Sequence, residues 1–246
     1  RIARFGALRH RDFRLYWIGH VISVSGQHML WMVQPWLIYE ISGSKVFLGV
    51  NALAQAIPAT ALVLIGGAIA DKFDQRKLLI GVQASYIVLL SALVVLALTE
   101  ILSVWHIFVI SFLHSGFSSF ESPARQSMFT HLVDRKDMPN AVAMNSAIHP
   151  GTRILAPVLG GLILALVFDA TGSARIAGGA VLTVTTAGVA VYVLMLLRVH
   201  MPAVKRSRGG SVVADMTAGA NFIWRNRIFA SLITMAYYNM VFGISL

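Results

Sequence analysis

Apolar stretches long enough to cross a lipid bilayer alternate with short polar breaks along the chain. A transmembrane helix needs about 20 mainly apolar residues, and the stretches near that length are 15–38, 47–70, 78–98, 102–120, 141–168, 174–197 and 229–246. Backbone groups in lipid must be hydrogen-bonded within their own segment, and the period-2 alternation of a membrane β-barrel is missing. The pattern therefore predicts an all-α polytopic membrane protein.

Composition supports the same class. Hydrophobic residues make up 57% of the 246 residues and charged residues 12%, against about 45–50% and about 25% in soluble domains. So few charges cannot cover a water-facing surface, which argues against a disordered chain, a collagen-like chain and a typical cytosolic enzyme. The chain has no cysteine, so disulfides, thiolate metal sites and a cysteine nucleophile are excluded. The first apolar stretch is a full span without a cleavage site after it, and we expect no signal peptide.

The basic residues lie in alternate breaks between the apolar stretches. Seventeen of the 20 Lys and Arg residues fall on one side, whereas the opposite breaks hold only Lys45 and Arg175. Because cytoplasmic loops carry the excess of Lys and Arg, this pattern predicts a cytoplasmic N-terminus. It also accounts for the net charge of +10 without a nucleic-acid partner.

The spacing of the stretches divides the chain into three parts. Residues 1–197 hold six stretches and are expected to form a six-helix transmembrane bundle. Residues 198–227 form a basic stretch in which apolar positions recur at helical spacing, as in a cytoplasmic linker with an amphipathic helix. Residues 228–246 begin another apolar stretch that runs to the last residue without a polar flank, and we expect the chain to be cut at the start of a second bundle.

The sharpest local motif follows the second stretch and runs from Gly67 to Lys77. It resembles the signature between helices 2 and 3 of the major facilitator superfamily, roughly G-x-x-x-D-[RK]-x-G-[RK]-[RK]. The matching residues are Gly67, Asp71, Lys72 and Arg76, whereas Asp74 replaces a glycine and Gln75 replaces a basic residue. In that family the loop helps to set the equilibrium between inward-facing and outward-facing states. The resemblance implies that Asp71 forms an ion-pair latch among the surrounding cations.

A second match lies in the fifth stretch, from Arg153 to Gly161. It is similar to the antiporter signature of the same superfamily, which is centred on Gly-Pro-x-x-Gly-Gly. Pro157, Gly160 and Gly161 match, and Ala156 replaces the first glycine. Small residues allow close helix packing and proline allows a kink. The signature is associated with exporters rather than importers.

Two further stretches resemble the enterobactin-exporter-like, or secretion-effector, branch of the superfamily. They are 12–19, with the sequence DFRLYWIG, and 122–126, with the sequence SPARQ. A complete member has twelve helices in two halves. The resemblance thus implies a six-helix N-terminal bundle plus the first helix of the C-terminal bundle, and the remaining C-terminal half of the same transporter as a partner.

Polar side chains inside the apolar stretches are costly in lipid and usually face a cavity. The candidates for the substrate or proton cavity are Gln27, Trp31, Gln34, His114, Glu121, Arg125, Asn145 and His149, with His20 and Arg153 on the same helical faces. Several of them have a plainer interpretation. Gln27 and Gln34 suit interhelical hydrogen bonds, Trp31 suits packing, and His20 suits the cytoplasmic headgroup region. Glu121 suits a pair with Arg125 at the membrane edge if Ser122-Pro123 breaks the helix.

The buried guanidinium of Arg153 needs an acid, and Glu121 is the nearest candidate in the sequence. We therefore weigh two roles. Glu121, with His114 or His149, suits proton coupling, because carboxylates and imidazoles in a cavity can titrate near neutral pH. Arg153, Gln27 and Trp31 suit contact with a planar or aromatic substrate.

The function that these features predict is proton-coupled export of a small amphipathic molecule, drug-like or siderophore-like, across a bacterial inner membrane. The alternatives are a lysolipid or sugar carrier of the same fold, and a non-transporting membrane receptor or assembly subunit. No G-x-S-x-G, H-E-x-x-H, P-loop or G-x-G-x-x-G motif is present. We therefore expect no enzyme activity, no catalytic residue, no metal site and no cofactor besides the proton gradient.

Overall fold

A computed structural model of the chain describes residues 6–72, 74–129, 131–200, 231 and 235, and within these it leaves out the side chains of 63–72, 123 and 127. The chain divides into two compact units, Arg1–Lys205 and Arg206–Leu246. The expected linker, apart from 198–200, and nearly all of the seventh apolar stretch lie outside the described residues.

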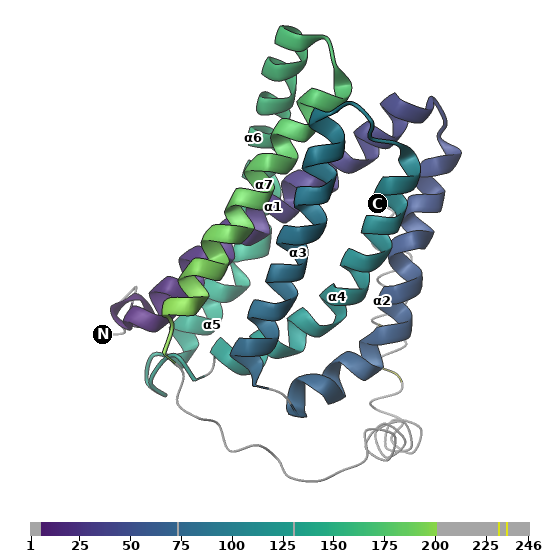
Figure 1. Cartoon of the computed structure of the whole chain (residues 1–246). Helices are drawn as coiled ribbons and strands as arrows, with labels where there is room; N and C mark the ends of the chain where they lie inside the picture. The colour runs from purple at the N-terminus through teal and green to yellow at the C-terminus, as the bar shows by residue number, and fades with distance from the viewer. Residues whose placement is uncertain (1–5, 73, 130, 201–230, 232–234, 236–246) are drawn as a thin grey trace. The chain divides into compact units, whose positions relative to one another are not determined.

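The first unit is built from helices, and its described residues contain no strand (Figure 1). The elements are η1 (Gly6–Arg9), α1 (Arg11–Ser42), α2 (Val46–Lys72), α3 (Gln75–Leu98), α4 (Val104–Phe129), α5 (Met138–Ser146), α6 (Ile148–Thr171) and α7 (Ala174–Arg198). The predicted all-α class is therefore confirmed. Three of the described helical segments, Gln75–Leu98, Met138–Thr171 and Ala174–Arg198, are long and apolar enough by length and composition to cross a membrane.

Two helix boundaries differ from the predicted ones. The backbone of α4 stays helical to Phe129, so the expected break at Ser122-Pro123 is wrong. Proline is tolerated in membrane helices because neighbouring groups compensate for the freed backbone acceptor. The fifth apolar stretch is two helices, α5 and α6, which meet at Ala147 in a conformation close to helical (φ −77°, ψ −14°).

Helix α1 packs against α7 and α6, and α3 runs between α7 and α4, with α2 on the far side of α4 (Figure 1). Small residues let these backbones approach. A Cβ atom added at Gly178 of α7 would lie 2.6 Å from the Leu37 side chain of α1, and one at Gly19 would lie 2.6 Å from Tyr192. The two ends of the α1–α7 interface therefore depend on glycine.

The glycine of the antiporter-like signature has a similar role. A Cβ atom on Gly160 of α6 would lie 3.2 Å from both Met29 and Met32 of α1, whereas Gly161 faces more open space. Pro157 lies within α6, and the helix continues through it. This part of the signature thus fixes the distance between α1 and α6, the two helices that carry most of the candidate polar residues.

Candidate transport site

A buried carboxylate lies at the centre of the polar residues of the bundle. Glu121 of α4 is 7% exposed, and three donors reach it. Gln83 Nε2 donates to Oε1 at 3.0 Å, Tyr86 Oη donates to Oε2 at 3.1 Å, and Arg125 Nη1 donates to Oε1 at 2.9 Å. Both oxygens act only as acceptors here, which is the bonding pattern of an ionised carboxylate. We call Glu121, Arg125, Gln83, Tyr86 and His20 the Glu121 cluster.

Helical spacing explains how the sequence builds this cluster. Glu121 and Arg125 are four residues apart on α4, and Gln83 and Tyr86 are three apart on α3, so each pair shares a helix face. Because α3 packs against α4, the two faces meet. The expected ion pair of Glu121 with Arg153 is wrong, because Glu121 forms its ion pair with Arg125, one turn further along α4.

Arg125 also contacts α1. Its Nη1 lies 3.2 Å from His20 Nδ1, and because a guanidinium can only donate, this imidazole nitrogen accepts. The His20 side chain is 2% exposed and lies between the rings of Tyr16 and Tyr192, with centroid distances of 5.8 and 6.0 Å. His20 is therefore part of the packed interior. Its plainer interpretation, a position in the cytoplasmic headgroup region, does not account for this burial.

A small cavity adjoins the Glu121 cluster. Its volume of about 10 Å³ has room for about one water molecule, and Gln27, Tyr86, His114 and Glu121 are among the residues that line it. The His114 ring stacks on Tyr86 at 4.2 Å. A second cavity of the same size is lined by Trp31, Gln34 and again His114. His114 thus lies at both cavities, and it shares the first with Glu121.

Not every candidate polar residue faces open space. Gln34 is buried and donates from Nε2 to Ser111 Oγ of α4. This is the interhelical hydrogen bond that its plainer interpretation described. Gln27 is half-buried and lines the cavity beside Glu121.

A second group of polar residues lies on α1 and α6. The His149 ring contacts the His28 ring at a centroid distance of 6.0 Å, and His28 contacts Trp31 at 5.1 Å. Trp31 is 53% exposed, so packing inside the described part of the chain does not explain it. Arg153, one turn after His149 on α6, is also exposed. We call His28, Trp31, His149 and Arg153 the His28–Arg153 face.

Asn145, at the end of α5, adds a candidate that is half-buried. Its Oδ1 is buried and has no hydrogen-bond partner in the part of the chain that the structure describes. The Asn145 side-chain amide thus supplies a buried hydrogen-bond acceptor that no described donor uses.

The loop after α2 is described only in part. Arg76 donates from Nε to the Leu196 carbonyl at 3.0 Å and from Nη2 to the Leu197 carbonyl at 2.7 Å. It therefore caps the C-terminus of α7, where carbonyls lack partners within the helix. Asp74, which stands in place of the family glycine, accepts from the Lys77 N–H at 3.1 Å and caps α3. The side chains of Asp71 and Lys72, like the surroundings of Gly67, are not described, so the Asp71 latch stays a prediction.

Sequence reasoning missed several members of the site. Gln83 and Tyr86 were not predicted, although a glutamine and a tyrosine three residues apart in an otherwise apolar stretch were a usable signal. Tyr16 and Tyr192 were also missed. Their hydroxyls are buried without a partner in the described residues, and only packing around His20 reveals them.

Comparison with known proteins identifies the family. Residues 2–224 match the family described as transmembrane secretion effector. The chain belongs to this family of major facilitator transporters. The resemblance stated from the sequence motifs is therefore confirmed, and the chain is an integral membrane protein.

Several curated relatives of this secretion-effector chain are transporters by name. It is 29% identical over 132 residues to the staphyloferrin A transporter of Staphylococcus aureus, an alignment that covers 53% of this chain and 33% of the relative. It is 20% identical over 234 residues to macrolide efflux protein A of Streptococcus pyogenes, covering 94% of this chain and 56% of the relative. It is 24% identical over 127 residues to the uncharacterised MFS-type transporter YfiS of Bacillus subtilis, covering 52% and 29%. The chain thus spans about a third to just over half of the length of these relatives.

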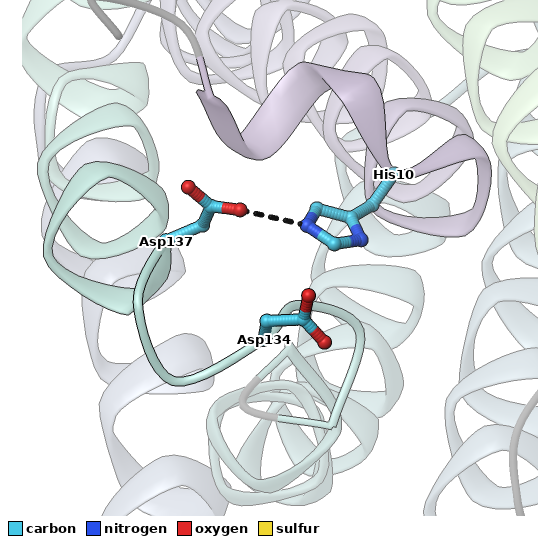
Figure 2. A group of neighbouring side chains, drawn as sticks. All are labelled: His10, Asp134 and Asp137. Carbon is cyan, nitrogen blue, oxygen red and sulfur yellow. Dashed lines mark hydrogen bonds and ion pairs between the residues drawn. The ribbon is translucent and has the colours of Figure 1, made fainter. Parts of the chain in front are cut away.

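The secretion-effector chain has one further group of possible metal ligands among its described residues, outside the helices of the bundle. His10, Asp134 and Asp137 have ligand atoms that all lie within 4.8 Å of one another (Figure 2). His10 Nε2 lies 3.0 Å from Asp137 Oδ2, and Lys136 Nζ lies 3.7 Å from Asp134 Oδ2. Both carboxylates thus already have a partner, and the group joins the segment before α1 to the loop before α5.

Proposed function

We propose that the protein is a secondary active transporter that exports a small amphipathic molecule, drug-like or siderophore-like, by proton-coupled alternating access. The observation that carries the proposal is the Glu121 cluster, a charged pair inside the membrane bundle beside a water-sized cavity. Ionisable residues in such places are costly and are typical of proton and substrate pathways. Membership of a transporter family, and relatives named for siderophore transport and macrolide efflux, support the same function.

The proposal includes a location and a partner. The bacterial relatives support a bacterial inner membrane, and the Lys and Arg distribution supports an N-terminus in the cytoplasm. Alternating access moves one half of such a fold against the other around a midplane site. The C-terminal half of the same transporter would therefore supply the opposite wall. The loop residues Gly67, Asp71, Lys72 and Arg76 would bias the equilibrium between the two states.

Glu121 suits a proton carrier because its neighbours can serve both protonation states. The ionised carboxylate accepts from Gln83 Nε2, Tyr86 and Arg125. A proton added to Oε1 or Oε2 turns that oxygen into a donor, which then needs an acceptor. Gln83 Oε1 is buried and has no partner among the described residues, so rotation of the Gln83 amide by half a turn would offer it.

Protonation of Glu121 would also weaken its hold on Arg125, because the ion pair would lose its negative partner. The guanidinium keeps His20 Nδ1 as an acceptor. The oxygens of Tyr16 and Tyr192 lie on the rings that flank His20 and have no partner in the described residues, so they would be free to accept from the guanidinium if it moved toward them. A shift of Arg125 from α4 toward α1 and α7 would couple the proton to a change in helix contacts.

Flux measurements on the complete protein test this function. Inside-out vesicles would receive erythromycin or ethidium, two cationic amphipathic probes, or dansylglycine, an anionic one, with a proton gradient imposed across the membrane. We expect uptake of at least one probe that collapses when a protonophore is added. Saturable binding with no flux of any probe would instead favour a receptor or assembly subunit, and flux that ignores the protonophore would remove proton coupling.

A further inference from the structure

We propose that the His28–Arg153 face binds an anionic group, a carboxylate or another oxyanion, so that the transported molecule carries a negative charge. This inference rests on the proposed function and names the substrate class. Its residues are not members of the Glu121 cluster, although the His149 ring contacts the His20 ring of that cluster at a centroid distance of 6.2 Å.

The contacts of α6 with α1 give the depth of Arg153 in the bundle. His149, four residues before it, contacts His28, and Gly160, seven residues after it, packs against Met29. Arg153 is therefore level with the middle of α1, which runs over 32 residues. A guanidinium at that depth is strongly disfavoured against lipid, so the surface that exposes Arg153 faces protein or a water-filled cavity.

The charges around Arg153 do not balance within the described part of the chain. Among the acids whose side chains the structure describes, only Glu121 lies well inside a helix, and Arg125 Nη1 is 2.9 Å from its Oε1. The other described acids lie at helix ends or in loops: Asp12, Glu40, Asp74, Glu100, Asp134, Asp137 and Asp169. Within the described part of the chain Arg153 thus has no counter-ion, and the His28–Arg153 face carries a net positive charge.

Two imidazoles belong to the same face as Arg153. His28 is 6% exposed, and its Nε2 is buried without a hydrogen-bond partner among the described residues. The exposed His149 ring lies against it, and Arg153, also exposed, follows one turn later on α6, so the buried His28 imidazole lies behind an exposed imidazole and guanidinium. Guanidinium groups bind carboxylates through two parallel hydrogen bonds. The exposed Trp31 ring beside His28 adds an apolar wall for the rest of an amphipathic anion.

Matched fluorescent probes test the charge preference without any need for flux. The complete protein in lipid nanodiscs would be titrated with dansylglycine, which is anionic, dansylglycinamide, which is neutral, and dansylcadaverine, which is cationic. Signals from empty nanodiscs would be subtracted. We expect dansylglycine to bind at least tenfold more tightly than dansylcadaverine.

Substitution of Arg153 then tests the residue. Arg153→Gln should weaken dansylglycine binding at least tenfold and change dansylglycinamide binding less than twofold, while Arg153→Lys should fall between. Arg135→Gln, which removes an exposed loop cation, is the control and should leave all three affinities unchanged. An unchanged dansylglycine affinity in Arg153→Gln would overturn the proposal, because it would mean that Arg153 serves another part of the protein.

The wild-type preference and the Arg153→Lys variant also test the charge preference. If Arg153→Gln does not fold, the affinities of the wild type and of Arg153→Lys for the three probes test the proposal instead. A wild type that binds dansylcadaverine as tightly as dansylglycine, or more tightly, overturns the proposal. Arg153-dependent binding of dansylglycine without any proton-driven flux would support this inference and overturn the proposed export. Flux that is indifferent to probe charge and to Arg153 would overturn this inference alone.

Discussion

Removal of one member of the Glu121–Arg125 pair should destabilise the bundle more than removal of both. The pair is 2.9 Å apart, and the two side chains are 9% and 16% exposed. Arg125→Met keeps most of the side-chain length and leaves the carboxylate with only Gln83 and Tyr86 as donors. Glu121→Gln keeps the shape of the side chain and leaves the guanidinium with His20.

The expected magnitude follows from the burial of the pair. An uncompensated charge left by breaking a buried pair costs about 3–5 kcal/mol, so each single variant should lose roughly that much. In the double variant no charge is left unpaired, and the amide that Glu121→Gln introduces would keep neutral hydrogen bonds of about 1 kcal/mol each. We therefore expect a loss of about 1–3 kcal/mol for the double variant and a coupling energy of about 3 kcal/mol or more.

The assay is reversible unfolding of the complete protein in mixed micelles by titration with sodium dodecyl sulfate, followed by circular dichroism. All four proteins of the cycle would be measured under one set of conditions. If the stability losses of the two single variants add up to the loss of the double variant within about 0.5 kcal/mol, as for independent sites, Glu121 and Arg125 do not stabilise the bundle as a pair. A double variant less stable than both single variants would refute it as well.

Two further perturbations test the packing and the loop. Gly178→Val adds a side chain whose Cβ atom would lie 2.6 Å from Leu37, and this overpacking should lower the free energy of unfolding by about 1–3 kcal/mol in the same assay. The control is Gly81→Ala, at a position with open space around it, which should cause no loss of stability. Arg76→Gln removes both hydrogen bonds to the end of α7. Amide hydrogen exchange in the last turn of α7 should become several-fold faster, while exchange in the middle of α7 should not change. If the last turn exchanges at the same rate in the variant and the wild type, Arg76 does not cap α7.

Hydropathy predicted the helices well because a membrane span is a local property of the sequence. The predicted segments 78–98 and 174–197 correspond closely to α3 and α7. The ends were less predictable where packing overrides local preference. The helix α4 continues past Pro123, and the fifth segment is divided at Ala147, because contacts with other helices decide those points.

The site was predictable in its residue types but not in its pairs. The helical spacing of Glu121 and Arg125 was visible in the sequence. Arg153 was nevertheless the favoured partner of Glu121, because no other acid in the sequence suited Arg153. Which helix faces meet depends on the order of packing, α3 on α4 and α1 on α7. That order also brings in Gln83 and Tyr86, which no motif marked.

The central claim is that Glu121 carries the proton that drives export. The most direct measurement is the luminal pH of inside-out vesicles during uptake of a transported probe, for the wild type, Glu121→Gln and the control Glu40→Gln, which removes an exposed carboxylate near the end of α1. The account predicts that uptake alkalinises the lumen with the wild type and with Glu40→Gln, and that Glu121→Gln leaves luminal pH unchanged. Alkalinisation at the wild-type rate with Glu121→Gln would contradict it.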